Sequence, residues 1–253
     1  NQWGSGASVP DMSKEETQMW FYYVGCRYME EAEVEALHLG QINLMCGMKD
    51  KANGYKGVAR LTEALHKAAL TKARRGTVLL DYHGTGIAVN SKHLFDFVSY
   101  PLSLTEVRSS TTMEAKLNKN ESGSIIGKTG AASSYPTPSL WKTKRLPYIL
   151  EFDNYGTSSS PGTYGIDGFI WGYDQISWFC NITEVYQKQV IAETVAYLKE
   201  QDGAYGHLQM PCCRLAVGSA PGTYSPYRCN TRSAACPTGR NLEETIKTIF
   251  ASQ

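Results

Sequence analysis

Three short apolar segments of this chain end in the same way, in a mixture of carboxylates, aromatic residues and glycine. With the polar residues that follow them, these segments cover residues 77–84, 148–156 and 169–174. A strand inside a parallel sheet is apolar because helices cover both of its faces, and parallel sheets form their sites at the carboxyl ends of strands. Acids at such ends are costly to desolvate. We therefore expect the three ends to meet in one pocket, where aromatic residues beside acids indicate a sugar-like ligand.

The length and charge of the chain favour one globular domain that does not bind nucleic acid. Its 253 residues are enough for one barrel-sized domain, and no break in composition divides them. We therefore predict a single domain over residues 1–253. The 25 basic and 24 acidic residues give a net charge of +1, which disfavours a nucleic-acid surface. Because no apolar run reaches about 18 residues, we expect no membrane span.

Helical and extended patterns alternate along the chain, as in an α/β protein. We predict helices beginning at Ser13 and Asn241 and over 58–75 and 181–201, and strands over 34–41, 77–81, 94–99, 148–153 and 206–210. This count is short of the eight units of a complete (β/α)8 TIM barrel. The prediction is a TIM-barrel-like fold that is partial or lacks its N-terminal strands, with a doubly wound sheet as the alternative. Residues 103–147 are predicted to be a long insertion loop.

Cysteines and glycosylation sequons favour a secreted, extracellular protein with disulfide bonds. Four of the seven cysteines fall in a Cys-rich loop predicted over residues 211–240, and none forms a paired C-x-x-C zinc pattern. Two sequons predict glycosylation at Asn120 and Asn181. The odd number of cysteines predicts a free thiol, or a disulfide bond to a partner chain or to a removed segment. A set of reduced, buried cysteines is the alternative interpretation.

Several distinctive segments are spread over most of the chain: 20–28, 35–41, 73–81, 146–156, 171–179, 206–211 and 243–247. In these segments the chain resembles a poorly characterised family of TIM-barrel, glycoside-hydrolase-like proteins. The resemblance implies a barrel fold and members that are longer at the N-terminus. It also implies an acid at the position of Gln175, and the amide found there favours a protein without catalytic activity.

The predicted function is hydrolysis of a glycan by paired carboxylates at the carboxyl ends of strands. Glycosidases hold two carboxylates about 5–5.5 Å apart for retention, or about 6.5–9.5 Å apart for inversion. Glu151 is the predicted acid/base, because an apolar strand favours the protonated form that a general acid needs. Asp174 or Asp81 is the predicted second carboxylate.

Side chains near these acids are predicted to bind the substrate: His38, Gln41, His83, Asp153, Tyr155, Trp171 and Tyr173. No cofactor is expected, and no P-loop, nucleophile elbow or zincin motif is present. Other roles remain open for the same residues. The acids could cap helices or pair with an arginine, the aromatic residues could fill the core, and Asp81, His83 and His38 could bind zinc. The rival function is a non-catalytic extracellular protein that binds carbohydrate or forms an assembly.

Overall fold

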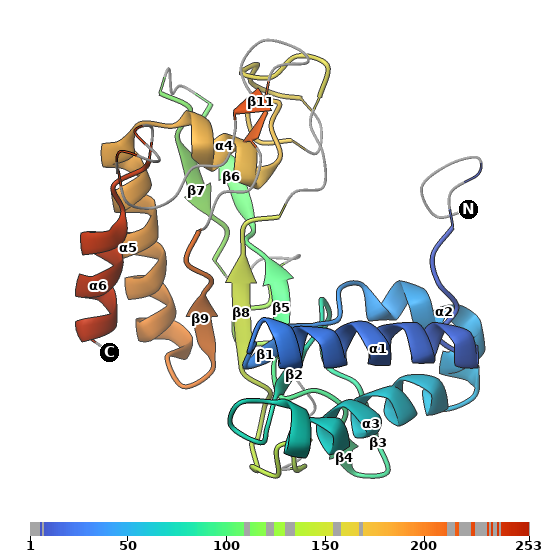
Figure 1. Cartoon of the computed structure of the whole chain (residues 1–253). Helices are drawn as coiled ribbons and strands as arrows, with labels where there is room; N and C mark the ends of the chain where they lie inside the picture. Colours follow the sequence, from blue (N-terminus) through green and yellow to red (C-terminus); the bar gives the residue numbers. More distant parts are fainter. Residues whose placement is uncertain are drawn as a thin grey trace. The chain divides into compact units, whose positions relative to one another are not determined.

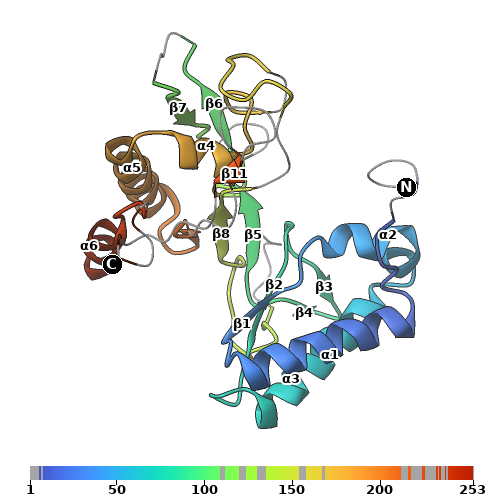
Figure 2. The same cartoon turned by 45° about the horizontal axis from the view of Figure 1, so that its top comes forward.

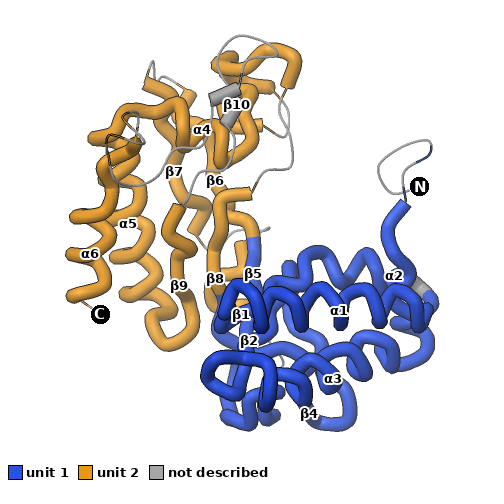
Figure 3. Tube along the Cα trace, viewed as in Figure 1, with its two compact units in different colours: residues 1–100, 129–148 blue, residues 101–128, 149–253 orange. Residues whose placement is uncertain are grey.

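A computed structural model describes residues 8–108, 112–119, 124–129, 135–153, 158–166, 169–211 and 239–252, with Gly6 and residues 216–217, 224–225, 232, 234 and 237 (Figure 1). The chain forms two compact units (Figure 3). Unit 1 contains residues 1–100 and 129–148, and unit 2 contains residues 101–128 and 149–253. The sequence predicts a single domain. The boundary between the two units crosses the chain inside two strands, after Tyr100 and after Tyr148.

Unit 1 begins with helices α1 (Glu15–Glu31), α2 (Ile42–Ala52) and α3 (Lys56–Lys72). Helices α1 and α3 run side by side (Figures 1 and 2). Their backbones approach closely at Gly25, where an added Cβ would lie 2.6 Å from a methyl group of Leu65. The buried carboxylate of Asp50 accepts the backbone N–H groups of Gly57 at 2.7 Å and Val58 at 3.2 Å, so it satisfies donors that the first turn of α3 leaves unpaired.

The strands of unit 1 bring three chain segments into parallel register. Strand β1 (Ala36–His38) pairs with β2 (Leu79–Asp81), and His38 lies opposite Asp81. Strand β5 (Val98–Pro101) begins in unit 1, where Ser99 forms a parallel bridge with His83. Strands β3 (Ala88–Val89) and β4 (Lys92–His93) follow β2 along the chain and pair with each other as an antiparallel hairpin. The carboxyl ends of β1 and β2 and residue Ser99 of β5 therefore lie at one edge of unit 1.

Unit 2 contains the remaining elements: β6 (Leu104–Glu106), β7 (Ala115–Leu117), β8 (Tyr148–Glu151, whose first residue belongs to unit 1), α4 (Gln175–Asn181), α5 (Glu184–Asp202), β9 (Gly206–Leu208), β10 (Ala216–Val217), β11 (Tyr224–Ser225) and α6 (Glu243–Ala251). Strands β6 and β7 form an antiparallel hairpin inside the predicted insertion loop. The predicted helix 181–201 begins later than expected, because Thr183 is its N-cap and accepts the N–H of Tyr186 at 3.3 Å.

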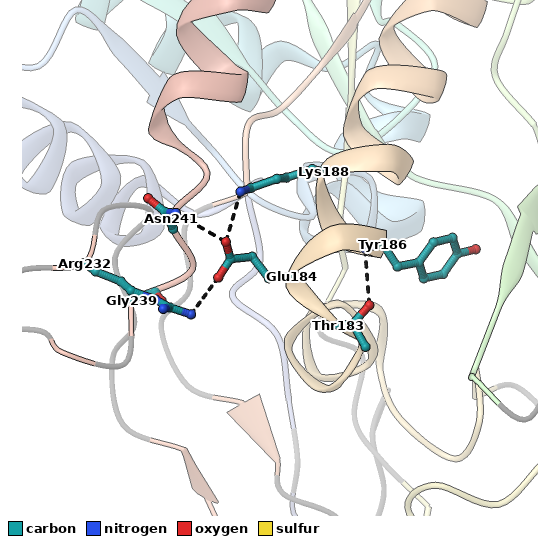
Figure 4. A network of polar contacts seen from close by, with 7 residues as sticks. All are labelled: Thr183, Glu184, Tyr186, Lys188, Arg232, Gly239 and Asn241. Atoms are coloured by element: carbon teal, nitrogen blue, oxygen red, sulfur yellow. Dashed lines mark hydrogen bonds and ion pairs between the residues drawn. The ribbon is translucent and has the colours of Figure 1, made fainter.

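A polar network holds the C-terminal segment of unit 2 against the start of α5 (Figure 4). The carboxylate of Glu184 accepts hydrogen bonds from Arg232 at 2.6 Å, Lys188 at 2.9 Å and Asn241 at 3.3 Å. Arg232 also donates to the carbonyl of Gly239 at 3.1 Å. The hydrogen bond from Lys188 is the largest of the effects that lower the pKa of Glu184. These contacts join Arg232 and Asn241 to the first turn of α5.

The prediction of a TIM barrel is wrong. The described residues form separate sheets of two or three strands, in the orders β1-β2, β3-β4, β5-β8-β9, β6-β7 and β10-β11, and none of them closes on itself. A barrel requires every strand to pair with both neighbours around a ring. The sequence predicts much of the local alternation of helices and strands, but ring closure is a long-range property that this alternation does not determine.

The prediction of disulfide bonds is also wrong for the cysteines whose structure is described. Cys26, Cys46 and Cys180 are buried thiols that form no disulfide. The four cysteines of the predicted loop over 211–240 lie outside the described residues. Among the described helices, none is both long enough and apolar enough to cross a bilayer.

Candidate functional site

A polar arrangement that solvent can reach lies in unit 1 where β1 and β2 end. His38 is the last residue of β1 and Asp81 is the last residue of β2, and their register places both side chains on one face of the sheet. Nδ1 of His38 lies 2.8 Å from Oδ2 of Asp81. The His38 side chain is 45 % exposed, whereas that of Asp81 is 7 % exposed. A buried carboxylate therefore fixes the orientation of a ring that solvent can reach.

Backbone hydrogen bonds continue the register beyond the two strands and fix the positions of these side chains. Leu39 donates to the carbonyl of Asp81 at 2.8 Å, and His83 donates to the carbonyl of Gly40 at 3.0 Å. Gly40 has a φ of +61°, which a residue with a side chain rarely adopts. The turn after β1 thus depends on glycine, and it holds the end of β1 against the end of β2.

Ser99 is a member of this site that the sequence analysis did not select. Its hydroxyl oxygen lies 3.4 Å from Nδ1 of His38, and its side chain is buried. Ser99 donates its backbone N–H to the carbonyl of Tyr82 at 3.0 Å and accepts the N–H of Gly84 at 3.2 Å. The signal was present in the sequence, because Ser99 ends the predicted strand 94–99 as Asp81 ends its own strand.

His83 and Gln41, both predicted to bind substrate, follow the same two strand ends. His83 is half-buried and packs edge-on against the ring of Tyr100, with 5.8 Å between ring centroids. Gln41 is exposed at the start of α2. The structure thus brings four of the predicted residues, His38, Gln41, Asp81 and His83, to one edge of unit 1. Among the residues that the structure describes, no group of three or more His, Cys, Asp or Glu side chains could hold a metal ion, so the zinc alternative has no support.

The predicted acids of unit 2 have different surroundings. Asp174 is the N-cap of α4: its Oδ1 accepts the N–H of Ser177 at 2.7 Å and its Oδ2 accepts the hydroxyl of Ser177 at 3.0 Å. Burial raises the pKa of Asp174, and the hydrogen bonds from Ser177 partly oppose that shift. Both carboxylate oxygens therefore have a local structural role.

Glu151 and Asp153 lie at and just after the end of β8, and both are half-buried. The side chain of Gln175 fixes this strand end. Its carbonyl oxygen accepts the N–H of Asp153 at 3.0 Å, and its amide nitrogen donates to the carbonyl of Leu102. The amide at position 175 is thus a buried cross-link that needs a donor and an acceptor together.

The aromatic residues predicted to stack on a sugar are largely inside unit 2. Trp171 is 7 % exposed and Tyr173 is 1 % exposed. The indole N–H of Trp171 donates to the carbonyl of Glu114 at 3.3 Å, and the Tyr164 ring packs edge-on at 5.3 Å between centroids. This burial favours a role in packing over a role as an open stacking surface.

The remaining predicted positions have separate locations. Tyr155 and Asn120 lie outside the described residues. Asn181 is the last residue of α4, and its side-chain amide donates to the carbonyl of Ser177 at 2.8 Å.

Comparisons with known proteins provide no family for the chain: no family model, no curated protein and no solved structure matches it.

Proposed function

We propose that the protein is an enzyme in which His38 transfers protons and Asp81 is its positioning residue. The observation that supports this most is the contact of 2.8 Å between a half-exposed imidazole and a buried carboxylate. An ionised Asp81 accepts the proton on Nδ1, so the neutral ring has its basic lone pair on Nε2. Such a group can remove a proton from water or from a substrate hydroxyl, which typically accelerates a reaction about 10²–10⁴-fold.

The position of Ser99 selects among reactions for this dyad. In a Ser-His-Asp triad the serine and the carboxylate contact opposite nitrogens of the ring. Here Ser99 lies 3.4 Å from Nδ1, the atom that also contacts Asp81. Ser99 therefore supports the ring, and the proposed reaction activates water or a substrate hydroxyl directly.

The proposed ligand is rich in hydroxyl groups, and carbohydrate is the first class to test. His83 and Gln41 follow the same strand ends as His38 and carry hydrogen-bonding side chains. The pairing of Glu151 with Asp174 or Asp81 stays a prediction, and the capping bonds of Asp174 weigh against its use as a nucleophile. The extracellular location and a disulfide-linked partner also stay predictions.

The test is a substrate panel of nitrophenyl glycosides, esters and phosphates together with natural oligosaccharides. It compares the wild type with His38→Gln, and it uses His207→Gln, which changes an exposed strand histidine in unit 2, as the matched control. We expect His38→Gln to lower kcat/KM about 10²–10⁴-fold and the control to leave it unchanged. Turnover that is equal in the wild type and His38→Gln would contradict the proposal. Glycan binding without turnover would identify a binding protein.

A further inference from the structure

Helix α1 presents large apolar side chains to solvent. Met19 is 69 % exposed, Trp20 is 63 % exposed and Tyr23 is 54 % exposed. The opposite face of the helix, with Gln18, Gly25, Cys26 and Met29, is buried. A surface helix normally has one apolar face and one polar face. The exposed side of α1 carries large apolar and aromatic side chains among its charged ones, and this needs a separate explanation.

The exposed side chains form a narrow stripe along the helix. Glu16, Trp20, Tyr23 and Arg27 are spaced by four, three and four residues, which places them one above another on a helix surface. All four are exposed. Figures 1 and 2 show α3 beside α1 along the helix. We define the outer stripe as these four residues. It has an acid at one end, a base at the other and two aromatic residues between them.

We propose that the outer stripe binds the same stripe of a second copy of this chain, with the two α1 helices antiparallel. A two-fold axis that passes between residues 21 and 22 places Glu16 of one copy opposite Arg27 of the other, and Trp20 opposite Tyr23. The same operation repeats each contact, as an isologous interface requires. The order of charge and aromatic side chains is therefore complementary to itself when one helix is reversed. This charge complementarity identifies a second copy as the occupant.

Contacts within one copy fix the position of Arg27 on the stripe. The guanidinium of Arg27 lies 5.9 Å from the centroid of the Tyr23 ring and forms an ion pair with Glu31. Arg27 is thus held along the stripe, next to the aromatic residues. Tyrosine, tryptophan and arginine are also the residues most often found where protein interfaces derive their affinity.

The size of the stripe limits the expected strength of the dimer. A helix of 17 residues is about 25 Å long. One face of it offers less than the roughly 800 Å² per partner that is buried in a standard interface. We therefore expect a dimer with a dissociation constant in the micromolar range, which the experiment must cover.

The test is analytical ultracentrifugation of the whole chain from about 1 to 200 μM. The wild type should dimerise, and Glu16→Lys or Arg27→Glu should each weaken dimerisation at least tenfold, because each places like charges opposite each other twice. The double variant with both changes should recover the wild-type constant within about threefold. Val185→Ala, which truncates an exposed apolar residue of α5 in unit 2, is the control that should change nothing.

Mixing the two single variants gives the sharpest result. In a mixed dimer, Lys at position 16 faces Glu at position 27, while the native Arg27 faces the native Glu16. The mixture should therefore dimerise even though each variant alone does so weakly. A wild type that is monomeric at all concentrations would overturn the proposal. So would a double variant, or a mixture, that does not recover the dimer.

Discussion

Asp96 lies against His66 in unit 1, with 3.5 Å between its Oδ2 and Nε2 of the histidine. The carboxylate is fully buried and accepts the backbone N–H groups of Leu80 and Ser139, each at 2.9 Å. Nε2 of His66 is buried and has no hydrogen-bond partner among the described residues. Both ring nitrogens of His93 are also buried and have no hydrogen-bond partner among the described residues. Unit 1 therefore contains a half-buried histidine, His66, and a buried one, His93, with buried ring nitrogens that lack a hydrogen-bond partner among the described residues.

These histidines predict that acid destabilises the fold. Burial lowers the pKa of His66, with Asp96 partly opposing the shift, and burial lowers the pKa of His93, both from an ordinary value of 6.5. The unfolded chain therefore binds more protons below pH 6.5 than the folded chain does, so stability is complete above that value and falls as the pH decreases. The slope is at most about 1.4 kcal/mol per pH unit for each histidine.

Urea unfolding at pH 7.5 and pH 5.5 checks this prediction. The unfolding midpoint of the wild type should decrease at pH 5.5, and His66→Gln with His93→Gln should reduce the dependence on pH. His207→Gln changes an exposed histidine and should leave that dependence unchanged. An equal pH dependence of the midpoint in the wild type and in the variant with His66→Gln and His93→Gln would show that the two rings do not control this dependence.

Replacement of Gln175 by Glu should destabilise unit 2. A carboxylate can still accept the N–H of Asp153, but it cannot donate to the carbonyl of Leu102, and it places a charge in a site that is 5 % exposed. We expect a loss of about 2–4 kcal/mol in the free energy of unfolding at pH 7. At pH 5 part of this loss should disappear, because a protonated Glu has a donor again. A Gln175→Glu variant as stable as the wild type would contradict the cross-linking role.

Replacement of Asp174 by Ser separates its capping role from a catalytic one. Serine keeps an oxygen that can accept the N–H of Ser177, so stability should change by only a few tenths of a kcal/mol, whereas Asp174→Ala should lose about 0.5–2 kcal/mol. If Asp174 is only a cap, any turnover found with the wild type should persist in Asp174→Ser. Loss of turnover with the stability retained would restore Asp174 as a candidate nucleophile.

The thiol of Cys46 should react slowly in the folded protein. Burial, with Asp50 adding to it, raises its pKa to about 12. Because the thiolate is the reactive form, alkylation at pH 8 should be roughly 100-fold or more slower in the native chain than in urea. Peptide mapping by mass spectrometry after timed treatment with iodoacetamide measures this rate directly. Rapid labelling, or recovery of Cys46 in a disulfide, would contradict the description of Cys46 as a buried free thiol.

Local patterns in the sequence predicted most of the secondary structure. The helix predicted over 58–75 is α3, the strand predicted over 77–81 contains β2, and the strand predicted over 148–153 contains β8. In each case apolar periodicity and a nearby glycine or capping residue determine a local structure. The segment 169–174 failed as a strand because Ile170 and Tyr173 form a tight antiparallel bridge around Gly172, where φ is +76°.

Properties that depend on distant parts of the chain were not predictable in this way. Ring closure of a sheet requires pairings between strands far apart in sequence, and the described sheets remain small and open. The contact between His38 and Asp81 joins residues 43 positions apart. Both residues were selected because they end apolar strands, but the register of two parallel strands, which no local pattern determines, makes them partners.

A double-mutant cycle on His38 and Asp81 tests the central claim most directly. With a substrate from the panel, kcat and KM are measured for the wild type, His38→Gln, Asp81→Asn and the double variant, and circular dichroism confirms that each is folded. If Asp81 acts only through His38, Asp81→Asn lowers kcat with little change in KM, and the double variant is no worse than His38→Gln alone. Additive losses in the double variant, or an unchanged kcat in Asp81→Asn, would contradict the account.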